Sequence, residues 1–256
     1  MTSLGMPIWY ELTTADPAAA ERFYGAVVGW TPGSFDGGDG YTLWNADDGA
    51  AVGGMQSLAD ASPTGPAWLA YFHVADVDAA ITLIEAAGGA VHAPPQDVVG
   101  AGRVAMVADP QGVPFYVMTP ASGEPGVSTS FSPTLPQRCA WNELVTTDQA
   151  AALPFYATLL GWTSTEVMSM GPMGDYSFVD CGAVRMGAMM NRESPDHPTG
   201  WRFYFHVPDV DAAAAAIDSG GGRIVMGPMD VPGGQRIVMA RDPQDVPFGL
   251  VSGEPA

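Results

Sequence analysis

A long internal repeat is the feature that most constrains this chain. The stretch WYELTTADPAAAERFYGAVVGW at residues 9–30 returns as WNELVTTDQAAALPFYATLLGW at residues 141–162. Repeats of this length indicate duplicated folding units, so they have to be accounted for before any local pattern is interpreted. Two further echoes keep the same order along the chain: AWLAYFHVADVDAA (67–80) with GWRFYFHVPDVDAA (200–213), and GRVAMVADPQGVPF (102–115) with QRIVMARDPQDVPF (235–248).

The repeat predicts two homologous domains. Between the two sets of echoes, the segment 121–136 is rich in Ser, Pro and Gly, a composition that is typical of a linker. We therefore predict one domain over residues 1–120 and a second over 137–256. A chain of 256 residues that is 47% hydrophobic is long and apolar enough for two domains with buried cores.

Each predicted domain divides again into two similar modules. In the first module, Ile8–Thr13 has the pattern of a strand, and Asp16 with Pro17 supplies a helix cap and a proline at the first helical position. A helix is then expected over Ala18–Val28. Three short strands are expected to follow, namely Tyr41–Asn45, Ala51–Gln56 and the segment between them.

The second module begins in the same way. Trp68–Val74 predicts a strand, and Asp76–Ala87 predicts a helix that ends at a Gly-Gly pair. Strands are expected near Arg103–Ala108 and Pro114–Met118. The order βαβββ, repeated four times, predicts an α+β fold.

The charge of the chain excludes several classes of partner. Nine basic residues, all of them arginines, stand against 28 acidic ones, which gives a net charge of −19. Such a charge repels phosphate backbones and anionic membrane surfaces, so we expect no nucleic-acid or membrane partner. The absence of lysine also excludes a Schiff-base or P-loop lysine. Without an apolar run of membrane length or a signal-peptide pattern, we expect a cytoplasmic protein.

At this point the chain resembles a known family. The D-P-A-A-A-x-x-F-Y…G-W helix, the V-x-D-V-D-A-A helix and the D-P-Q turn are together similar to the vicinal oxygen chelate superfamily of glyoxalases, bleomycin resistance proteins and extradiol dioxygenases. The tandem W-x-E-L form is most similar to the mycobacterial culture-filtrate glyoxalase-like antigens. The resemblance covers essentially the whole chain and implies that paired modules form half-open barrels, each around a cavity.

The resemblance also implies where a divalent metal would bind, and this sequence departs from the family there. Metal ligands in the family come from the first and last strands of a module and are His, Gln or Glu. Of the residues at these positions, only Tyr116 can bind a divalent metal, and it is a poor ligand. We therefore expect no metal or other cofactor, with a divalent metal as the alternative. The positions are occupied by Trp9, Leu69, Tyr116, Trp141, Arg202 and Gly249.

A lone glutamate lies in an apolar strand of each domain, and it is the best candidate for chemistry. Alternate residues of a strand face the same side, so Glu11 shares a face with Trp9, where the family's ligand would point. By the same parity, a Tyr and a His share one face of the strand that opens the second and fourth modules. A carboxylate near an imidazole suits general acid–base catalysis. The candidate catalytic residues are Glu11, His73, Glu143, Tyr204 and His206.

Aromatic and cationic side chains on the same strands are candidates for ligand binding. The alternative is structural: the histidines lie at strand ends, where an imidazole often makes only a structural hydrogen bond, and the glutamates are then backbone or arginine partners. The tryptophans are core residues in that alternative. The candidate ligand-binding residues are Trp9, Tyr71, Tyr116, Trp141 and Arg202.

These observations favour a glyoxalase- or bleomycin-resistance-like protein that works without metal. We expect it to hold a small apolar or aromatic organic molecule in a half-barrel cavity, for sequestration or for a simple proton-transfer or lyase reaction. The alternative is a metal-dependent lyase or dioxygenase of the same superfamily with a non-standard Glu/His site. Whether the protein is an enzyme stays open. Because each half carries two modules, we expect a monomer.

Overall fold

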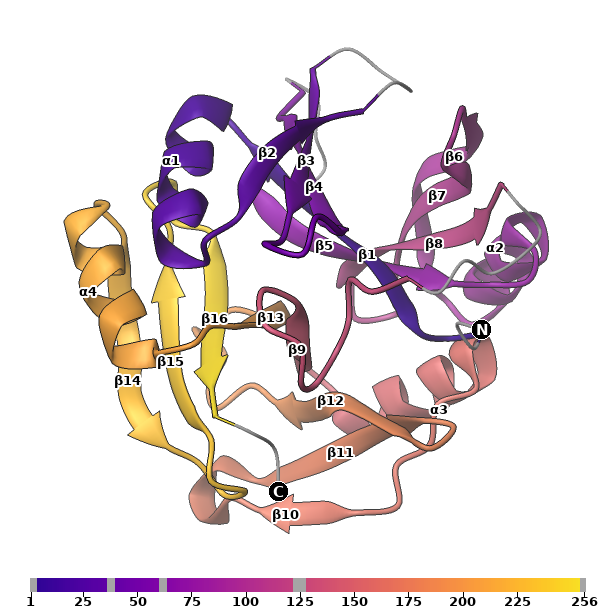
Figure 1. Ribbon diagram of the computed structural model, residues 1–256. Helices are drawn as coiled ribbons and strands as arrows, with labels where there is room; N and C mark the ends of the chain where they lie inside the picture. The colour runs from indigo at the N-terminus through magenta and orange to yellow at the C-terminus, as the bar shows by residue number, and fades with distance from the viewer. Residues whose placement is uncertain (1–3, 36–39, 60–63, 122–127, 254–256) are drawn as a thin grey trace. The chain divides into compact units, whose positions relative to one another are not determined.

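The computed structural model describes residues 4–35, 40–59, 64–121 and 128–253. The first module consists of β1 (Pro7–Thr14), α1 (Pro17–Val27), β2 (Thr31–Ser34), β3 (Tyr41–Asn45) and β4 (Ala51–Ser57). The second consists of β5 (Ala67–His73), α2 (Val77–Ala86), β6 (Ala90–Val98), β7 (Gly102–Ala108) and β8 (Pro114–Pro120). Both have the order βαβββ (Figure 1).

The third and fourth modules repeat this order. The third consists of β9 (Cys139–Thr146), α3 (Gln149–Leu160), β10 (Val167–Ser169), the short 3₁₀ helix η1 (Gly171–Met173), β11 (Asp175–Cys181) and β12 (Val184–Asn191). The fourth consists of β13 (Gly200–His206), α4 (Val210–Ser219), β14 (Arg223–Asp230), β15 (Arg236–Arg241) and β16 (Pro247–Ser252). The predicted α+β class and the four βαβββ modules are thus confirmed.

Two strands differ from the sequence-based expectation. The segment between Asn45 and Ala51 is a turn and not a strand, and the missing strand of the first module is β2, which precedes β3. In the second module the expectation omitted β6. Both strands lie at the edge of a sheet, where prolines are tolerated, and both contain proline. Their sequences therefore lack the alternation that marks a half-buried strand.

The strands form two eight-stranded mixed sheets. The first has the order β2-β3-β4-β1-β5-β8-β7-β6, and the second has the order β10-β11-β12-β9-β13-β16-β15-β14. Within each module the first strand runs parallel to the last one, as in the pair β1 and β4, whereas the hairpin strands are antiparallel. Each sheet therefore combines the two modules of one half of the sequence, as the resemblance implied.

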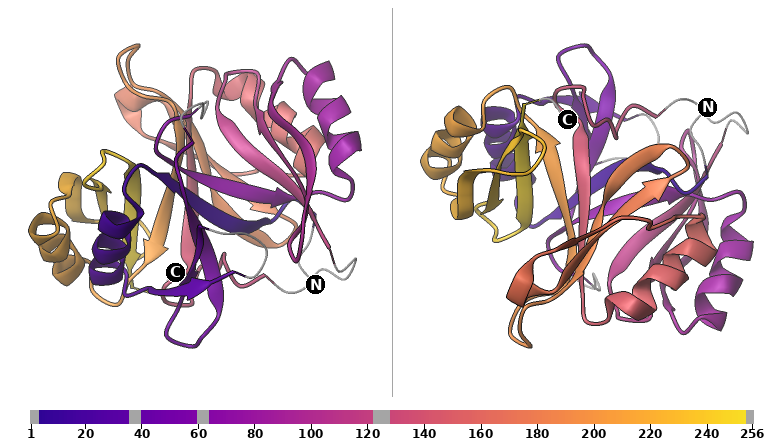
Figure 2. Two further views of the ribbon diagram at one scale, coloured as in Figure 1. Left: turned by 90° about the horizontal axis from the view of Figure 1, so that it is seen from above. Right: turned by 90° about the horizontal axis from the view of Figure 1, so that it is seen from below.

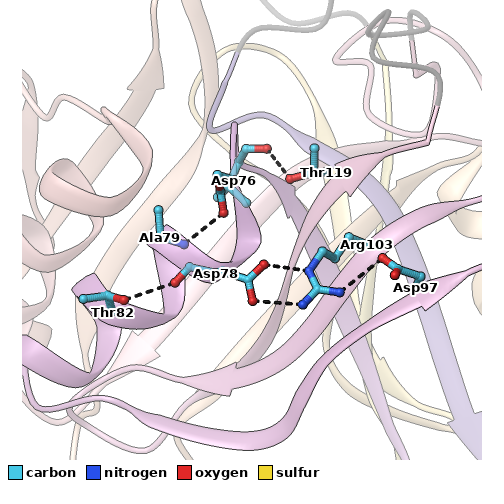
Figure 3. A network of polar contacts seen from close by, with 8 residues as sticks. Asp76, Asp78, Ala79, Thr82, Asp97, Arg103 and Thr119 are labelled. Atoms are coloured by element: carbon cyan, nitrogen blue, oxygen red, sulfur yellow. Dashed lines mark hydrogen bonds and ion pairs between the residues drawn. The ribbon is translucent and has the colours of Figure 1, made fainter.

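An aspartate caps the N-terminus of each helix. In α2, Asp76 accepts a hydrogen bond from the backbone N–H of Ala79 at 3.0 Å, and this satisfies a donor of the first turn (Figure 3). Beside it, Arg103 of β7 bonds Asp78 of α2 and Asp97 of β6. In the fourth module, Arg236 makes the equivalent ion pairs with Asp211 of α4 and Asp230 of β14. Because these pairs are exposed, their contribution to stability is small.

By density of contacts, the described chain divides into two compact units, and each unit combines one module from each half of the sequence. The 1/4 unit combines Trp9–Trp68, Thr129–Trp141 and Arg202–Ala256, and the 2/3 unit combines Met1–Ile8, Leu69–Ser128 and Asn142–Trp201. In the 1/4 unit α1 packs beside α4, and in the 2/3 unit α2 packs beside α3 (Figure 2). Each helix thus has its helical neighbour in the other half of the sequence.

A buried tyrosine of the F-Y motif holds the 1/4 unit together. Tyr24 of α1 donates to Asp242 at 3.2 Å and accepts from the indole N–H of Trp68 at 2.8 Å. Asp242 also accepts from the backbone N–H groups of Gln244 and Val246 in the D-P-Q turn. The helix of the first module is therefore bonded to the last hairpin of the fourth.

The 2/3 unit contains the same arrangement. Tyr156 of α3 donates to Asp109 at 3.0 Å, and Asp109 accepts from the backbone N–H groups of Gln111 and Val113. Both aspartates are almost completely buried, and burial raises the pKa of each carboxyl above its usual value. The F-Y and D-P-Q motifs recur together because they are partners across the repeat.

The G-W motif makes a second link in each unit. Trp30 donates its indole N–H to the carbonyl oxygen of Gln137 at 2.9 Å, and the side chain of Gln137 donates to the carbonyl oxygen of Gly29 at 2.9 Å. In the 2/3 unit, Trp162 donates to the carbonyl oxygen of Gly5 at 2.8 Å. The segment before the opening strand of one half therefore docks on the helix end of the other half.

The predicted boundaries at 1–120, 121–136 and 137–256 stay a prediction. Residues 122–127 of the predicted linker lie outside the described residues. The end of the predicted linker is tied to the fold, because Phe131 bridges to Cys139. Among the described residues, no helix combines the length and the apolar character needed to cross a membrane.

We expect the buried aspartates to give the protein a characteristic pH dependence. A carboxyl whose pKa is raised in the folded state keeps its proton at a pH where the unfolded chain has lost it. Its contribution to stability is therefore complete below the unfolded value of about 4 and is lost as the pH rises through the raised folded value. Asp109→Asn and Asp242→Asn should each remove one such loss. As the pH rises from about 4 through the raised folded pKa, the free energy of unfolding of the wild type should therefore fall relative to that of either variant.

Urea unfolding between pH 4 and pH 7 measures the difference. Asp218→Asn, at an exposed carboxyl on α4, is the matched control and should follow the wild type at every pH. If Asp109→Asn and Asp242→Asn also follow the wild type, these two carboxyls do not titrate with folding.

Candidate functional site

The inner face of the first module is the sheet face that carries Trp9, Glu11, Tyr41 and Gln56. Glu11 is 2% exposed, and its Oε1 accepts a hydrogen bond from Nε2 of Gln56 at 2.7 Å. Next to this pair, the indole N–H of Trp9 donates to the hydroxyl of Tyr41 at 2.7 Å. The predicted glutamate therefore lies among an amide, a phenol and an indole, all within the 1/4 unit.

Strand register explains this arrangement. Glu11 of β1 lies opposite Gly54 of β4, and Tyr41 of β3 lies opposite Gln56. A Cβ atom added at Gly54 would overlap the ring and hydroxyl of Tyr41. The missing side chain lets Tyr41 lie across β4 and reach Trp9.

The inner face of the third module is built on the same register from different residues. Glu143 lies opposite Ala188, and Tyr176 lies opposite Met190. Ala188 therefore stands in place of Gly54, and Met190 in place of Gln56. Here the hydroxyl of Tyr176 donates to Oε2 of Glu143 at 3.0 Å. The glutamate, which is 5% exposed, is paired with a phenol instead of an amide.

Apolar and aromatic side chains surround this pair. Met168 of β10 and Met190 of β12 flank Tyr176 on its two neighbouring strands. The ring of Phe178 packs edge-on against that of Tyr176 at 5.6 Å between centroids. The guanidinium of Arg185 lies 4.6 Å from the centre of the Phe178 ring. The surroundings are suited to a flat, apolar ligand with one polar group.

Two of the predicted ligand-binding residues come together in the 2/3 unit. Tyr71 of β5 stacks on Tyr116 of β8, with 4.1 Å between ring centroids and 8° between the ring planes. His73 lies at the end of β5, is 8% exposed, and has no hydrogen-bond partner at Nδ1 among the described residues.

The matching strand of the 1/4 unit is arranged differently. Gly249 lies opposite Tyr204, and a Cβ atom at Gly249 would overlap the Tyr204 ring, so the tyrosine covers the glycine. Trp141 packs against the cluster that contains Tyr204. Arg202 directs Nη1 to the sulfur of Met239 at 3.4 Å.

His206 makes the kind of contact that a structural histidine makes. Its Nε2 lies 3.2 Å from the carbonyl oxygen of Gly253, so one ring nitrogen bonds the backbone at the end of the chain. Nδ1 is buried and has no hydrogen-bond partner within the described part of the chain.

The predicted sets of Glu, Tyr and His are divided between the two compact units. Glu11 belongs to the 1/4 unit and His73 to the 2/3 unit, whereas Glu143 belongs to the 2/3 unit and His206 to the 1/4 unit. Their joint roles remain predictions. Five residues of the two inner faces were not among the predicted site residues and lie on the hairpin strands of the two modules: Tyr41, Gln56, Tyr176, Phe178 and Met190. Aligning YTLWN at 41–45 with YSFVD at 176–180 would have revealed the shared tyrosine.

The residues at the family's metal positions do not fit a metal ion. Trp9 donates a hydrogen bond, Leu69 is apolar and buried, and the place beside Gly249 is filled by Tyr204. Tyr116 lies flat against another ring, and Arg202 is a cation. Among the described residues, no group of three or more His, Cys, Asp or Glu side chains could hold a metal ion.

The sequence matches the glyoxalase/bleomycin resistance protein/dioxygenase superfamily over residues 7–117 and 138–250. These two stretches cover most of the chain and coincide with the two tandem pairs of modules. The chain therefore belongs to this superfamily.

Two named proteins are similar to this chain over nearly its whole length. CFP32 of Mycobacterium tuberculosis, which carries the name of a glyoxylase, is 31% identical over 98% of this chain and 96% of its own length. The anthracycline biosynthesis protein DnrV of Streptomyces peucetius is 31% identical over 96% of this chain and 93% of its own.

Solved structures share the fold at low sequence identity. An extradiol ring-cleaving dioxygenase from B. fuscum has a TM-score of 0.68 and 17% identity, covering 98% of this chain and 72% of that one. The Mn(II)-bound glyoxalase from Novosphingobium aromaticivorans has a TM-score of 0.65 and 18% identity, covering 98% of this chain and 83% of that one.

The Gly54/Ala188 difference should control where the hairpin tyrosine points. In Gly54→Ala the new Cβ displaces the Tyr41 ring and breaks the Trp9–Tyr41 hydrogen bond, at a cost of about 1–3 kcal/mol. Urea unfolding and a crystal structure of the variant measure both effects.

Ala188→Gly is the matched change in the third module. It should leave the Tyr176–Glu143 bond in place, because that bond does not need the space that Gly54 provides. A Gly54→Ala structure with an unmoved Tyr41 ring would contradict this account of the two faces.

Proposed function

We propose that this protein binds a small, largely apolar or aromatic organic molecule on the inner face of the third module, without a metal. Glu143 and Tyr176 form the polar end of the site, and Met168, Phe178 and Met190 form its apolar part. The protein then either sequesters the molecule or catalyses a simple proton-transfer or lyase reaction on it.

The pairing of Glu143 with Tyr176 carries this proposal. A carboxylate and a phenol at hydrogen-bond distance can accept a proton from one atom of a ligand and donate one to another. In the first module Gln56 takes the position next to Glu11, and a neutral amide does not exchange protons in this way. The third module therefore suits the chemistry better than the first.

The names of the relatives agree with an aromatic ligand or a glyoxalase-like reaction. CFP32 carries the name of a glyoxylase, and DnrV is named an anthracycline biosynthesis protein. Anthracyclines are polycyclic aromatic compounds. A site of methionines and aromatic rings with one carboxylate is complementary to a flat ring system that carries a hydroxyl or carbonyl group.

We also propose that the protein is a monomer without a nucleic-acid partner. One chain contains all four modules, and the buried tyrosine–aspartate bond of each compact unit joins two modules of that same chain. The net charge of −19 opposes binding to a polyanion. Light scattering that gives a doubled mass at all concentrations would contradict the monomer.

Replacing the carboxylate should separate binding from folding. Glu143→Gln keeps the size of the side chain, so the circular dichroism spectrum and thermal midpoint should stay near those of the wild type. Ligand affinity should fall by at least about tenfold, and a catalysed rate should fall about 10²–10⁴-fold, because the proton acceptor is gone. The ligand is first identified by native mass spectrometry after incubation with cell extract, and binding is then measured by calorimetry.

Glu11→Gln is the matched control. Because Glu11 accepts a hydrogen bond from the neutral amide of Gln56 and lies outside the proposed site, its replacement should change affinity and rate much less. Equal losses in both variants, or no loss in Glu143→Gln, would show that the Glu143–Tyr176 pair is not the site.

Metal independence is tested separately. Protein purified without chelator and without a nickel column should contain far less than one transition-metal ion per chain, because the family's ligand positions provide no donor set. Elemental analysis by mass spectrometry measures the content. About one Zn, Fe, Ni or Mn per half of the chain would instead favour a metal-dependent lyase or dioxygenase with a non-standard Glu/His site.

A further inference from the structure

A pocket of about 210 Å³ lies on the other side of the third module's sheet, between α3 and strands β11 and β12. Val179 and Met189 line it, and in their strands they alternate with Phe178 and Met190 of the inner face. The pocket is therefore separated from the Glu143–Tyr176 pair by the sheet itself. Its lining residues are Leu153, Pro154, Tyr156, Ala157, Trp162, Thr163, Ser164, Val179 and Met189.

The first module has a tryptophan ring where the third module has this pocket. Trp44 lies opposite Gly53 in the β3–β4 hairpin, and Val179 lies opposite Gly187 in the equivalent β11–β12 hairpin. Val179 is thus the counterpart of Trp44, which is fully buried.

The neighbours of Trp44 have counterparts beside the pocket. The Trp44 ring stacks on Trp30 at 5.6 Å and lies 6.2 Å from Tyr24. The counterparts of these two residues in the sequence repeat, Trp162 and Tyr156, both line the pocket. The pocket therefore borders the counterparts of the two residues that contact the Trp44 ring, and these counterparts, Tyr156 and Trp162, stack on each other at 5.1 Å.

The chemistry of the lining matches an aromatic ring. The pocket opens to solvent, because Pro154, Ala157 and Thr163 of its lining are exposed, whereas Tyr156, Trp162, Val179 and Met189 form its buried wall. Hydroxyl groups of the lining come from Thr163, Ser164 and Tyr156, and the Tyr156 hydroxyl is already bonded to Asp109. The remaining lining is aliphatic, aromatic or thioether, which favours a flat molecule with at most one polar atom.

We propose that this pocket is a second ligand site, which binds a small flat aromatic molecule of the size of indole. The ligand takes the place that Trp44 occupies in the first module and lies between Val179 and the ring of Trp162. The site is independent of the Glu143–Tyr176 pair, because the two are on opposite faces of the sheet.

Indole itself is the probe for the test. It is titrated into the full-length protein by calorimetry, and its contact with the protein is followed by saturation-transfer NMR. The wild type should bind indole, and Val179→Trp should weaken binding by at least about tenfold and raise the thermal midpoint, because the new side chain fills the pocket. Unchanged affinity in Val179→Trp, or no binding by the wild type, overturns the proposal.

Three variants support this comparison. Val179→Phe fills part of the pocket and keeps the test valid if Val179→Trp does not fold; it should also weaken binding. Trp44→Val opens the equivalent space in the first module and should add a second equivalent of bound indole. Glu143→Gln should bind indole like the wild type. If Glu143→Gln loses indole while Val179→Trp retains it, indole occupies the inner face, and the proposed pocket is not a ligand site.

Discussion

Each compact unit is held together internally by one buried hydrogen bond, from Tyr24 to Asp242 in the 1/4 unit and from Tyr156 to Asp109 in the 2/3 unit. Each bond joins a helix from one half of the sequence to a turn from the other half. Removing either carboxyl leaves a buried tyrosine hydroxyl without its acceptor, at a cost of about 1–3 kcal/mol, so neither aspartate can be removed without loss. This explains why the F-Y and D-P-Q motifs recur together, and why the two halves of the chain depend on each other although each forms its own sheet.

Local patterns in the sequence predicted most of the secondary structure. The helices followed from their aspartate caps and apolar spacing, and the central strands from their alternation. The edge strands β2 and β6 were missed because TPGS at 31–34 and the Pro-Pro pair within 90–98 carry no such alternation. The bond between Tyr24 and Asp242 could not be predicted, because it joins residues 218 positions apart and depends on the packing of α1 beside α4.

The candidate site was predicted in part for a similar reason. Glu11 and Glu143 were identified from their own strand, since a glutamate in an apolar strand is unusual. Their partners Gln56 and Tyr176 lie on neighbouring strands, and strand register decides which of them reaches the carboxylate. The contrast between the two copies depends on single residues, because a glycine at 54 admits a tyrosine ring and a methionine at 190 cannot donate a hydrogen bond.

The first and third modules differ at the positions of Trp44 and Gln56, on both faces of the sheet. In the first module, the buried Trp44 ring packs beneath the helix, and Gln56 bonds the buried glutamate. In the third, the counterpart of Trp44 is Val179, which lines a pocket, and a phenol is bonded to the glutamate. Positions where a sequence departs from the most stable local choice are concentrated at functional sites. The duplication explains how such departures are tolerated: the first module keeps the buried tryptophan, and the third carries the two proposed binding sites, one on each face of its sheet.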